Sequence, residues 1–303
     1  MRFGVCIFGE QPLEKIVSQV KLAEELGYDS VWLADSQLLC RELYVTLTAC
    51  ALGTSRIRLG AGVTAPRTRH VSVTASAFAT LAEIAEGRLL LGVGTGNSLV
   101  RTIGARPARV SELEGYVASL RGLLDNRPAR FEAGVEGKVT WMSRPAGIPI
   151  YVAATGPKTT RAAARISDGV ILLVGASAPL LENGLRLVQE GAREAGKSAE
   201  DLDVVCWVPA SVSSDGALAR EHTSGQVAAL LHRVSLDGFD EEEREAIRRL
   251  RQHFGRYPHA NLARAGDGPA LDRYIDMLAL AGTPQEVRRR VEGLMKVGGF
   301  SQI

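Results

Sequence analysis

Two short glycine-containing segments of the sequence have the composition of anion sites. The first, at the start of a predicted helix, is Thr155-Gly156-Pro157-Lys158. The first N–H groups of a helix have no partner within it, and the helix dipole adds to their attraction for phosphate. The second segment, whose small side chains let a ligand approach the backbone amides, is Gly175-Ala176-Ser177. Ordinary helix capping and tight turns are the alternative interpretation of both segments.

Polar residues near three other strand ends have the chemistry to move a proton or orient a substrate. Asp35 ends an apolar run, where a carboxylate can carry a proton or, alternatively, cap the helix that follows. Asn97 and Ser98 follow the glycine pair of Gly94-Thr95-Gly96, which alone is a weak signal. His70 and Arg69 are predicted near the mouth of the pocket. A packed or solvated loop position is the alternative for His70, and surface charge is the alternative for Arg69 and Arg67.

Two glycines interrupt the apolar run that precedes these arginines. The run is Ile57-Arg58-Leu59-Gly60-Ala61-Gly62-Val63, and Thr64 follows it. Glycine weakens the interior of a strand, so its presence indicates that another group approaches the backbone closely or that the chain bends. The run therefore predicts a strand whose carboxyl end faces a ligand or is distorted.

The elements that must position these residues alternate along the chain. Apolar runs typical of buried strands lie at 2–8, 30–34, 57–63, 89–93, 150–153, 169–174, 203–208 and from 298. Helical spacing separates them at 13–26, 41–52, 71–85, 110–124, 158–166, 179–195 and 284–297. A polar insertion with a hairpin near 133–134 is expected at 126–147, and a charged helical region at 215–280.

Eight apolar strands alternating with helices predict a parallel sheet covered on its outer face. We expect one α/β domain, 1–303, closed into a (β/α)8 TIM barrel with insertions after strands four and seven. An open doubly wound sheet is the alternative, but no G-x-G-x-x-G fingerprint follows the first strand. In a barrel the active site lies at the carboxyl ends of the strands, where the residues above are found.

The charge, the cysteines and the apolar runs of the sequence argue against several classes of protein. The net charge of +2, without a long basic run, argues against a nucleic-acid partner. The four cysteines form no CxxC pair, which predicts free thiols in a reducing compartment. The sequence has no signal peptide, no apolar run long enough to span a bilayer, and no metal-binding or Ser-His-Asp pattern. A cytoplasmic enzyme without a metal site is the expectation.

Four segments taken together resemble one family. In chain order they are LAEELGYDSVWLAD at 22–35, LGAGVTAP at 59–66, EGRLLLGVGTGNS at 86–98 and AATGPKTTRAAARISDGVILL at 153–173. Their order and spacing resemble the bacterial luciferase-like oxidoreductases that use flavin or deazaflavin, most of all the methylenetetrahydromethanopterin reductase branch. The resemblance covers nearly the whole chain. It implies a barrel, a phosphorylated tricyclic cofactor, and commonly a homodimer or larger homo-oligomer.

The resemblance also implies roles for individual residues. The third strand of these enzymes carries a non-prolyl cis peptide that backs the cofactor ring, and the matching bond is Gly62-Val63. The residues implied to surround the ring are Cys6, Asp35, Gly62, Val63, Thr64, Gly94, Thr95, Gly96 and Asn97. The phosphate would lie at Thr155, Gly156, Pro157, Gly175 and Ala176. Two positions depart from the methanopterin reductases, which have Glu at position 6 and His at position 36, where this chain has Cys6 and Ser36. These departures put the methanopterin substrate in doubt.

We therefore predict an oxidoreductase that binds coenzyme F420, an 8-hydroxy-5-deazaflavin, or FMN, with F420 preferred. Hydride would pass between ring carbon C5 and a small organic substrate, with Asp35, Asn97 and His70 as catalytic residues. The alternative is a monooxygenase that uses reduced FMN and O2. Two further alternatives are a non-catalytic flavin-binding protein and a lyase that works through a Schiff base on Lys158.

Overall fold

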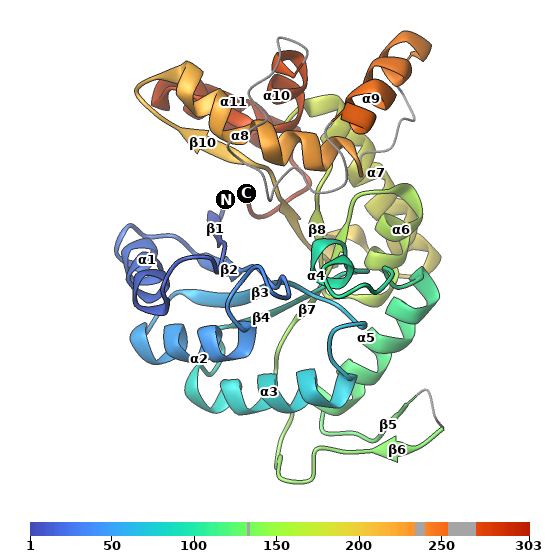
Figure 1. Cartoon of the computed structure of the whole chain (residues 1–303). Helices are drawn as coiled ribbons and strands as arrows, with labels where there is room; N and C mark the ends of the chain where they lie inside the picture. The colour runs from blue at the N-terminus through green and yellow to red at the C-terminus, as the bar shows by residue number, and fades with distance from the viewer. Residues whose placement is uncertain (132–133, 234–239, 254–270) are drawn as a thin grey trace.

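Seven parallel strands form one sheet in their order along the chain (Figure 1). This computed structural model describes residues 1–131, 134–233, 240–253 and 271–303. The strands are β1 (Gly4–Ile7), β2 (Ser30–Leu33), β3 (Arg58–Thr64), β4 (Leu89–Val93), β7 (Ile150–Ala154), β8 (Gly169–Leu172) and β9 (Asp203–Cys206). Each matches a predicted strand, and each is rich in the aliphatic residues typical of a sheet covered on both faces.

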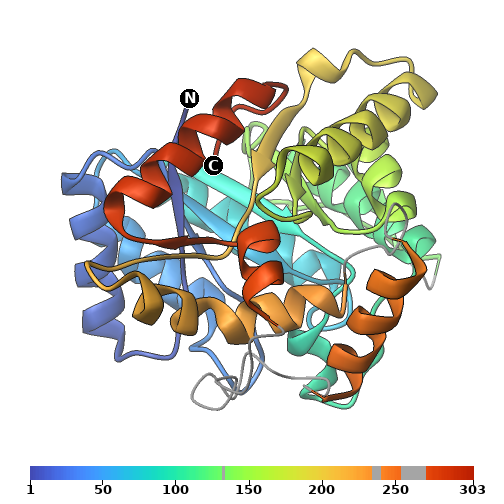
Figure 2. The ribbon, with the colours of Figure 1, turned by 90° about the horizontal axis from the view of Figure 1, so that it is seen from above.

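The C-terminal residues lie between the two outer strands of this curled sheet. Gln302 forms a parallel bridge with Arg2 on one side and with Val205 on the other. Its carbonyl accepts the Cys206 N–H at 2.8 Å, and its buried side chain donates to Ser30 Oγ at 2.7 Å. The strand predicted from 298 is thus one short two-sided bridge, and the chain ends lie side by side in Figures 1 and 2. An open sheet would have left the two outer strands without this shared partner.

Helices cover the outer face of the sheet (Figure 2). They are α1 (Leu13–Glu25), α2 (Leu43–Gly53), α3 (Val71–Ile84), α5 (Val110–Leu124), α6 (Pro157–Ile166), α7 (Ala178–Glu194) and α11 (Pro284–Val297). The buried residues of α1 are Ile16, Val20 and Ala23, which share one face at helical spacing. A capping box starts α11: the Thr283 side chain accepts from the Glu286 N–H, and the Glu286 carboxylate accepts from the Thr283 N–H.

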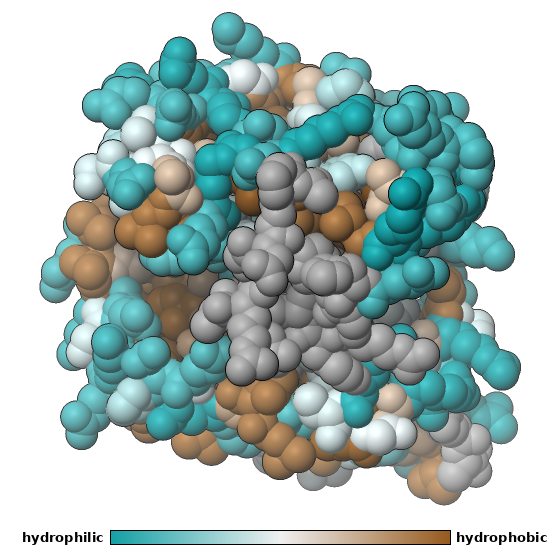
Figure 3. Space-filling model, turned by 45° about the horizontal axis from the view of Figure 1, so that its top comes forward, coloured by the Kyte–Doolittle hydropathy of each residue, from teal (hydrophilic) through white to brown (hydrophobic). Residues whose placement is uncertain are grey.

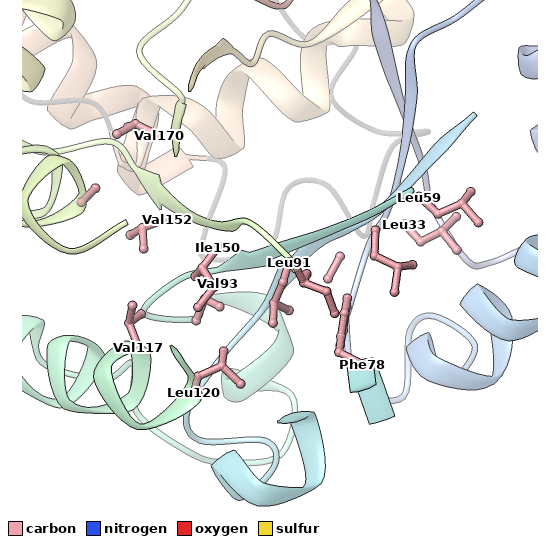
Figure 4. Packing of buried hydrophobic residues seen from close by; sticks show 14 of the residues in the cluster. Leu33, Leu59, Phe78, Leu91, Val93, Val117, Leu120, Ile150, Val152 and Val170 are labelled. Carbon is pink, nitrogen blue, oxygen red and sulfur yellow. The ribbon is translucent and has the colours of Figure 1, made fainter. Parts of the chain in front are cut away.

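The main hydrophobic core lies between the sheet and these helices (Figure 4). Leu59 and Leu91 of neighbouring strands project toward Phe78 of α3, and Val117 and Leu120 of α5 meet Ile150. A second cluster of larger side chains, centred on Trp32 and Tyr151, packs on the opposite face of the sheet. The two clusters explain why the strands alternate little between polar and apolar residues.

Further elements lie outside this alternation. The helix α4 (Ser98–Arg101) follows β4, and η1 (Ala199–Asp201) precedes β9. The hairpin predicted in the polar segment is β5 (Ala129–Arg130) paired with β6 (Glu136–Gly137), although residues 132–133 are outside the described part. Between β9 and α11 the structure describes β10 (Ala210–Val212), α8 (Gly216–Leu231), α9 (Glu241–His253), α10 (Asp272–Leu278) and β11 (Leu280–Gly282). The parallel pairing of β10 with β11 was not predicted, and residues 234–239 and 254–270 of the predicted helical region lie outside the described residues.

None of the helices in the described ranges has the length and apolar character of a membrane span. All four cysteines, of which Cys50 and Cys206 are buried, are free thiols, as predicted.

Candidate functional site

A cavity of about 780 Å³ lies at the carboxyl ends of the strands. Residues from the ends of β1 to β4 and β7 to β9 form its walls, and α8 contributes a further wall. Apolar side chains predominate among them, with a few polar groups between. This combination is typical of sites that bind small molecules and cofactors. Figure 3 shows the molecule from the side of α8 to α11, where apolar surface lies among polar residues beside the grey atoms.

The end of β3 is distorted in the way the resemblance implied. The peptide bond between Gly62 and Val63 is cis, and the pairing of β3 with β4 shifts register between Ala61 and Thr64. Gly62 and Val63 both line the cavity. The predicted cis bond is therefore confirmed, and it lies at the wall of the cavity.

Different neighbours explain why glycine is needed at the two positions in β3. A Cβ atom at Gly60 would lie 2.4 Å from the ring of Trp32, so this glycine makes room for a tryptophan and not for a ligand. A Cβ atom at Gly62 would lie 2.9 Å from the ring of Trp207 and 2.9 Å from Cβ of Trp32. The close approach predicted at this strand thus comes largely from two aromatic side chains, of which Trp207 lines the cavity.

Most of the predicted site residues meet at this cavity. Those that line it are Cys6, Asp35, Gly62, Val63, Gly94, Thr95, Gly96, Asn97, Ser98 and Thr155. Six others are not among the lining residues: Thr64, His70, Gly156, Pro157, Gly175 and Ala176. Thr64 is fully buried directly behind the wall, where its hydroxyl accepts a hydrogen bond from Arg69 at 3.3 Å.

His70 lies at the start of α3 and has a structural role there. It is the N-cap residue of α3, and its Nδ1 accepts the Ser72 N–H at 3.3 Å. The ring also packs edge-on against Phe131, with ring centroids 4.9 Å apart. Because the ring is used for capping and packing away from the cavity wall, its position does not support the predicted catalytic role.

The start of α6 is open, as the sequence predicted. Gly156 is the N-cap residue, no side chain caps the helix, and a Cβ atom there would meet no atom within 4 Å. Thr155 and Thr159 line the cavity, and neither hydroxyl is hydrogen-bonded to another described residue. Lys158 is exposed and is not a lining residue, which removes support for the Schiff-base alternative.

The second predicted anion segment is covered by α10. The Ala176 N–H donates to the Met277 carbonyl at 2.9 Å, and Ala176 is buried. A Cβ atom at Gly175 would lie 2.8 Å from Leu278 and 3.1 Å from the Met277 carbonyl oxygen. This position does not support the predicted phosphate contact at Gly175 and Ala176, because a carbonyl from a distant part of the chain already accepts the Ala176 N–H.

Asp35 belongs to a buried ion-pair network. Arg69 donates to both carboxylate oxygens of Asp35, at 2.6 and 3.2 Å, and Gln37 donates to one of them at 2.9 Å. Arg69 also donates to Glu42 at 2.7 Å and lies over the ring of Tyr44. Burial lowers the pKa of Arg69, but the hydrogen bonds and charge of Asp35 outweigh it and the pKa is raised. Both oxygens of Asp35 are therefore engaged within the protein.

A family model described as luciferase-like monooxygenase matches residues 1–301. The chain belongs to the luciferase-like family. Two similar relatives are named 5,10-methylenetetrahydromethanopterin reductase. The protein from Methanolobus tindarius is 29% identical over 98% of this chain and 92% of its own length. That from Archaeoglobus fulgidus is 31% identical over 98% and 91%. An F420-dependent glucose-6-phosphate dehydrogenase from Nakamurella multipartita is 34% identical over 74% of this chain and 71% of its own.

Solved structures agree with this assignment. The coenzyme F420 dependent tetrahydromethanopterin reductase from Methanopyrus kandleri superposes with a TM-score of 0.81 at 25% identity, covering 99% of this chain and 91% of that one. An F420-dependent secondary alcohol dehydrogenase superposes with a TM-score of 0.79 at 20% identity, over 100% and 92%, which shows the shared fold. The luciferase-like family is one of oxidoreductases, and the resemblance seen in the sequence is confirmed.

Cys6 of β1 brings a thiol to the cavity of this luciferase-like chain. Burial raises the pKa of the Cys6 thiol to about 12, and the neighbouring Cys40 thiol adds to the shift. A thiol with such a pKa stays protonated and neutral near pH 7. Position 6 of this chain therefore contributes a neutral side chain to the cavity wall.

Part of the luciferase-like cavity has no signal in the sequence. Trp207 follows β9, and Gln226, Ala229, Leu230 and Arg233 come from α8 and the residue pair after it. The helix belongs to the charged region that was predicted only as helical. Its spacing of three and four residues would have identified a common face, but nothing in the sequence indicates that the face meets the strand ends.

Proposed function

We propose that this luciferase-like chain is an F420-dependent oxidoreductase that transfers hydride between the cofactor and a small organic substrate. The observation that supports this most directly is the cavity that joins the cis Gly62-Val63 bond to the uncapped start of α6. Relatives between 29% and 34% identical carry names that specify a methanopterin reductase or an F420-dependent dehydrogenase. FMN is the alternative cofactor.

The residues of the cavity fit a flat, phosphorylated ring. Val63, Ile171 and Trp207 provide apolar surface, and a Cβ atom at Gly94 would lie 3.0 Å from Val63 and narrow the space beside it. The hydroxyls of Thr155 and Thr159 and the first N–H groups of α6 are donors of the kind that phosphate requires. The site therefore offers apolar contact for a ring and unpaired donors for an anion in one cavity.

When bound, F420 supplies the hydride from carbon C5 of its deazaflavin ring. Val63 and Gly94 shield one face of the ring, and Asn97 and Ser98 orient the ring or the substrate. The start of α6 binds the phosphate through its backbone. Apolar walls exclude water from the reacting groups, which keeps hydride from competing reactions.

Asp35 lines the cavity, but its carboxylate is hydrogen-bonded to other side chains and is not a free base. Because Arg69 and Gln37 occupy both of its oxygens, we propose that Asp35 fixes the end of β2 and the loop after it. Ser36 in that loop donates to Ser98 at 3.0 Å, so the network continues to the residues proposed to orient the ring. Proton transfer by Asp35 would require this pair to open.

We also propose that the scaffold is one domain, a (β/α)8 barrel with insertions after the fourth and seventh strands. The bridges of Gln302 to both outer strands support closure. The β5–β6 hairpin and the segment from β10 to β11 lie outside the strand–helix alternation and support the insertions.

A cytoplasmic homodimer or larger homo-oligomer is part of the proposal. The exposed Val45 and Val73 on α2 and α3 support an interface there, and light scattering tests it.

The test is hydride transfer with and without oxygen. Reduced F420 should be oxidised by an unsaturated substrate, screened among imines, aldehydes and ketones, at the same rate in air and under argon, and deuterium at C5 should appear in the product. Gly94→Val, which fills the cavity, should abolish the reaction, whereas Gly115→Ala on the outer helix α5, where a Cβ atom meets nothing within 4 Å, should not. Oxygen uptake that depends on reduced FMN and on Gly94 would establish the monooxygenase instead.

A further inference from the structure

One face of α8 is directed at the cavity. The helix begins at Asp215, whose carboxylate caps it by accepting the N–H groups of Ala217 and Leu218. The cavity-lining residues of this segment follow the spacing of a single helical face: Gln226, Ala229, Leu230 and Arg233. The Arg233 N–H donates to the Leu230 carbonyl at 2.8 Å, which fixes the backbone one turn beyond the last lining residues. Arg233 is thus anchored at the cavity wall.

The Arg233 guanidinium lines the cavity, and no acidic side chain among the described residues pairs with it. Its Nε is buried and has no hydrogen-bond partner in the part of the chain that the structure describes. Burial lowers the pKa of Arg233, and no acidic side chain in the described ranges offsets that shift. Asp35, the acidic residue buried at the same cavity, is already paired with Arg69. An unpaired buried charge with an unsatisfied donor is costly, so it calls for a specific reason.

We infer that Arg233 binds an oxyanion, either a carboxylate or a phosphate, on the molecule held in the cavity. A guanidinium presents its donors in a planar fork that matches two oxygens of such a group. The apolar neighbours Ala229 and Leu230 exclude water from the pair and strengthen it. The inference rests on the proposed function only for the identity of the bound molecule.

The oxyanion that Arg233 binds belongs to one of two molecules, the cofactor or the substrate. The first is the cofactor, whose tail carries phosphate and carboxylates, and the C-terminal part of α8 packs with Leu173 and Leu180 near the start of α7. The second is the substrate, which would then be a small acid or phosphate ester. The chemistry at Arg233 is the same in both cases, so the experiment must separate them.

The experiment compares the full-length protein with Arg233→Met, which keeps the length of the side chain and removes its charge, and with Arg233→Lys, which keeps the charge. Three probes are titrated: F420, the deazaflavin ring without its phosphate tail, and inorganic phosphate added to the F420-loaded protein. Without ligand, Arg233→Met should unfold at the same temperature as the wild type or higher, because an unpaired buried charge has been removed. A variant that is less stable without ligand, and restored by Lys, would show a structural role and overturn the inference.

The titrations with the three probes give the remaining outcomes. If the cofactor is the source, Arg233→Met binds F420 about 10- to 100-fold more weakly and the tail-less ring with unchanged affinity. If the substrate is the source, F420 affinity is unchanged, and phosphate raises the melting temperature of the loaded wild type but not of the loaded Arg233→Met. Equal binding of all three probes by both proteins would overturn the inference. If F420 does not bind the wild type, the proposed function fails, and the phosphate arm with the unloaded protein still decides the role of Arg233.

Discussion

Replacing Gly156 with aspartate should weaken cofactor binding without weakening the fold. Gly156 is the N-cap of α6 with φ of −105°, and a Cβ atom there has no neighbour within 4 Å. Aspartate is among the preferred N-cap residues, and relative to glycine it stabilises a helix by about a few tenths of a kcal/mol. The free energy of unfolding should therefore stay the same or rise slightly.

The effect on binding has the opposite sign. The new carboxylate would accept the N–H groups that the phosphate needs and would repel the phosphate itself. Two unit charges about 5 Å apart repel by about 1 to 3 kcal/mol at effective dielectric constants between those of water and a protein surface. We therefore expect the dissociation constant of F420 to rise by about 5- to 150-fold.

The matched control is Gly156→Asn, which has the same shape, is an equally good cap and carries no charge. Affinity is measured by titration calorimetry at low ionic strength with F420 and with the tail-less deazaflavin ring, and stability by urea unfolding. Aspartate should weaken only the phosphorylated ligand. If the aspartate and asparagine variants bind F420 equally well, the start of α6 is not the phosphate site.

Four further outcomes follow from other parts of the structure. Asp35→Asn should cost about 3 kcal/mol in urea unfolding, because Arg69 loses its buried partner and keeps only Glu42, whose side chain is 46% exposed; a loss below about 1 kcal/mol would show that the pair is solvated. Gly62→Ala should lower the melting temperature, since its Cβ would lie 2.9 Å from two tryptophan side chains, and an unchanged melting temperature would contradict that packing. The pKa of Glu112 is lowered from 4.5 to about 2 by the Arg109 N–H and by arginine side chains, so its stabilising contribution is complete above pH 4.5 and is lost as the pH falls toward 2. Glu112→Gln should flatten the dependence of the unfolding free energy on pH in this range, and identical acid profiles of the variant and the wild type would refute the assignment. Cys6, with its pKa raised to about 12, should react slowly with iodoacetamide at pH 8, and rapid labelling of Cys6 seen by peptide mass spectrometry would contradict the raised pKa.

The sequence was most informative where local pattern and tertiary position depend on the same residues. The start of α6 is an example, because a helix that follows a strand of a parallel sheet directs its first N–H groups toward the carboxyl ends of the strands. The cis bond was found through the resemblance and not from its residues, since glycine before valine has no local signal. Spacing alone located all seven main strands.

Errors arose where a distant segment supplied the deciding contact. Ala176 looked available for phosphate until Met277, about a hundred positions further along the chain, accepted its N–H. Arg233 was overlooked because a charged helix is usually a solvated one, and its burial depends on how α8 lies over the strand ends. His70 looked reactive by residue type, but its environment is a helix cap. For Ala176 and Arg233 the local sequence carries no information on the distant segment that surrounds them, whereas the partner of His70 is the nearby Ser72 N–H.

The central claim, that the cavity beside Gly62-Val63 holds F420, is tested most directly by fluorescence of Trp141→Phe. This variant removes Trp141, which does not line the cavity, and leaves Trp207, which lines it, and Trp32, whose ring centroid is 6.0 Å from that of Trp207. We predict that F420 quenches the remaining fluorescence with saturation at one molecule per chain, and that Gly94→Val in the same background abolishes the quenching. Fluorescence that F420 leaves unchanged, while FMN saturates the same signal, would contradict the claim.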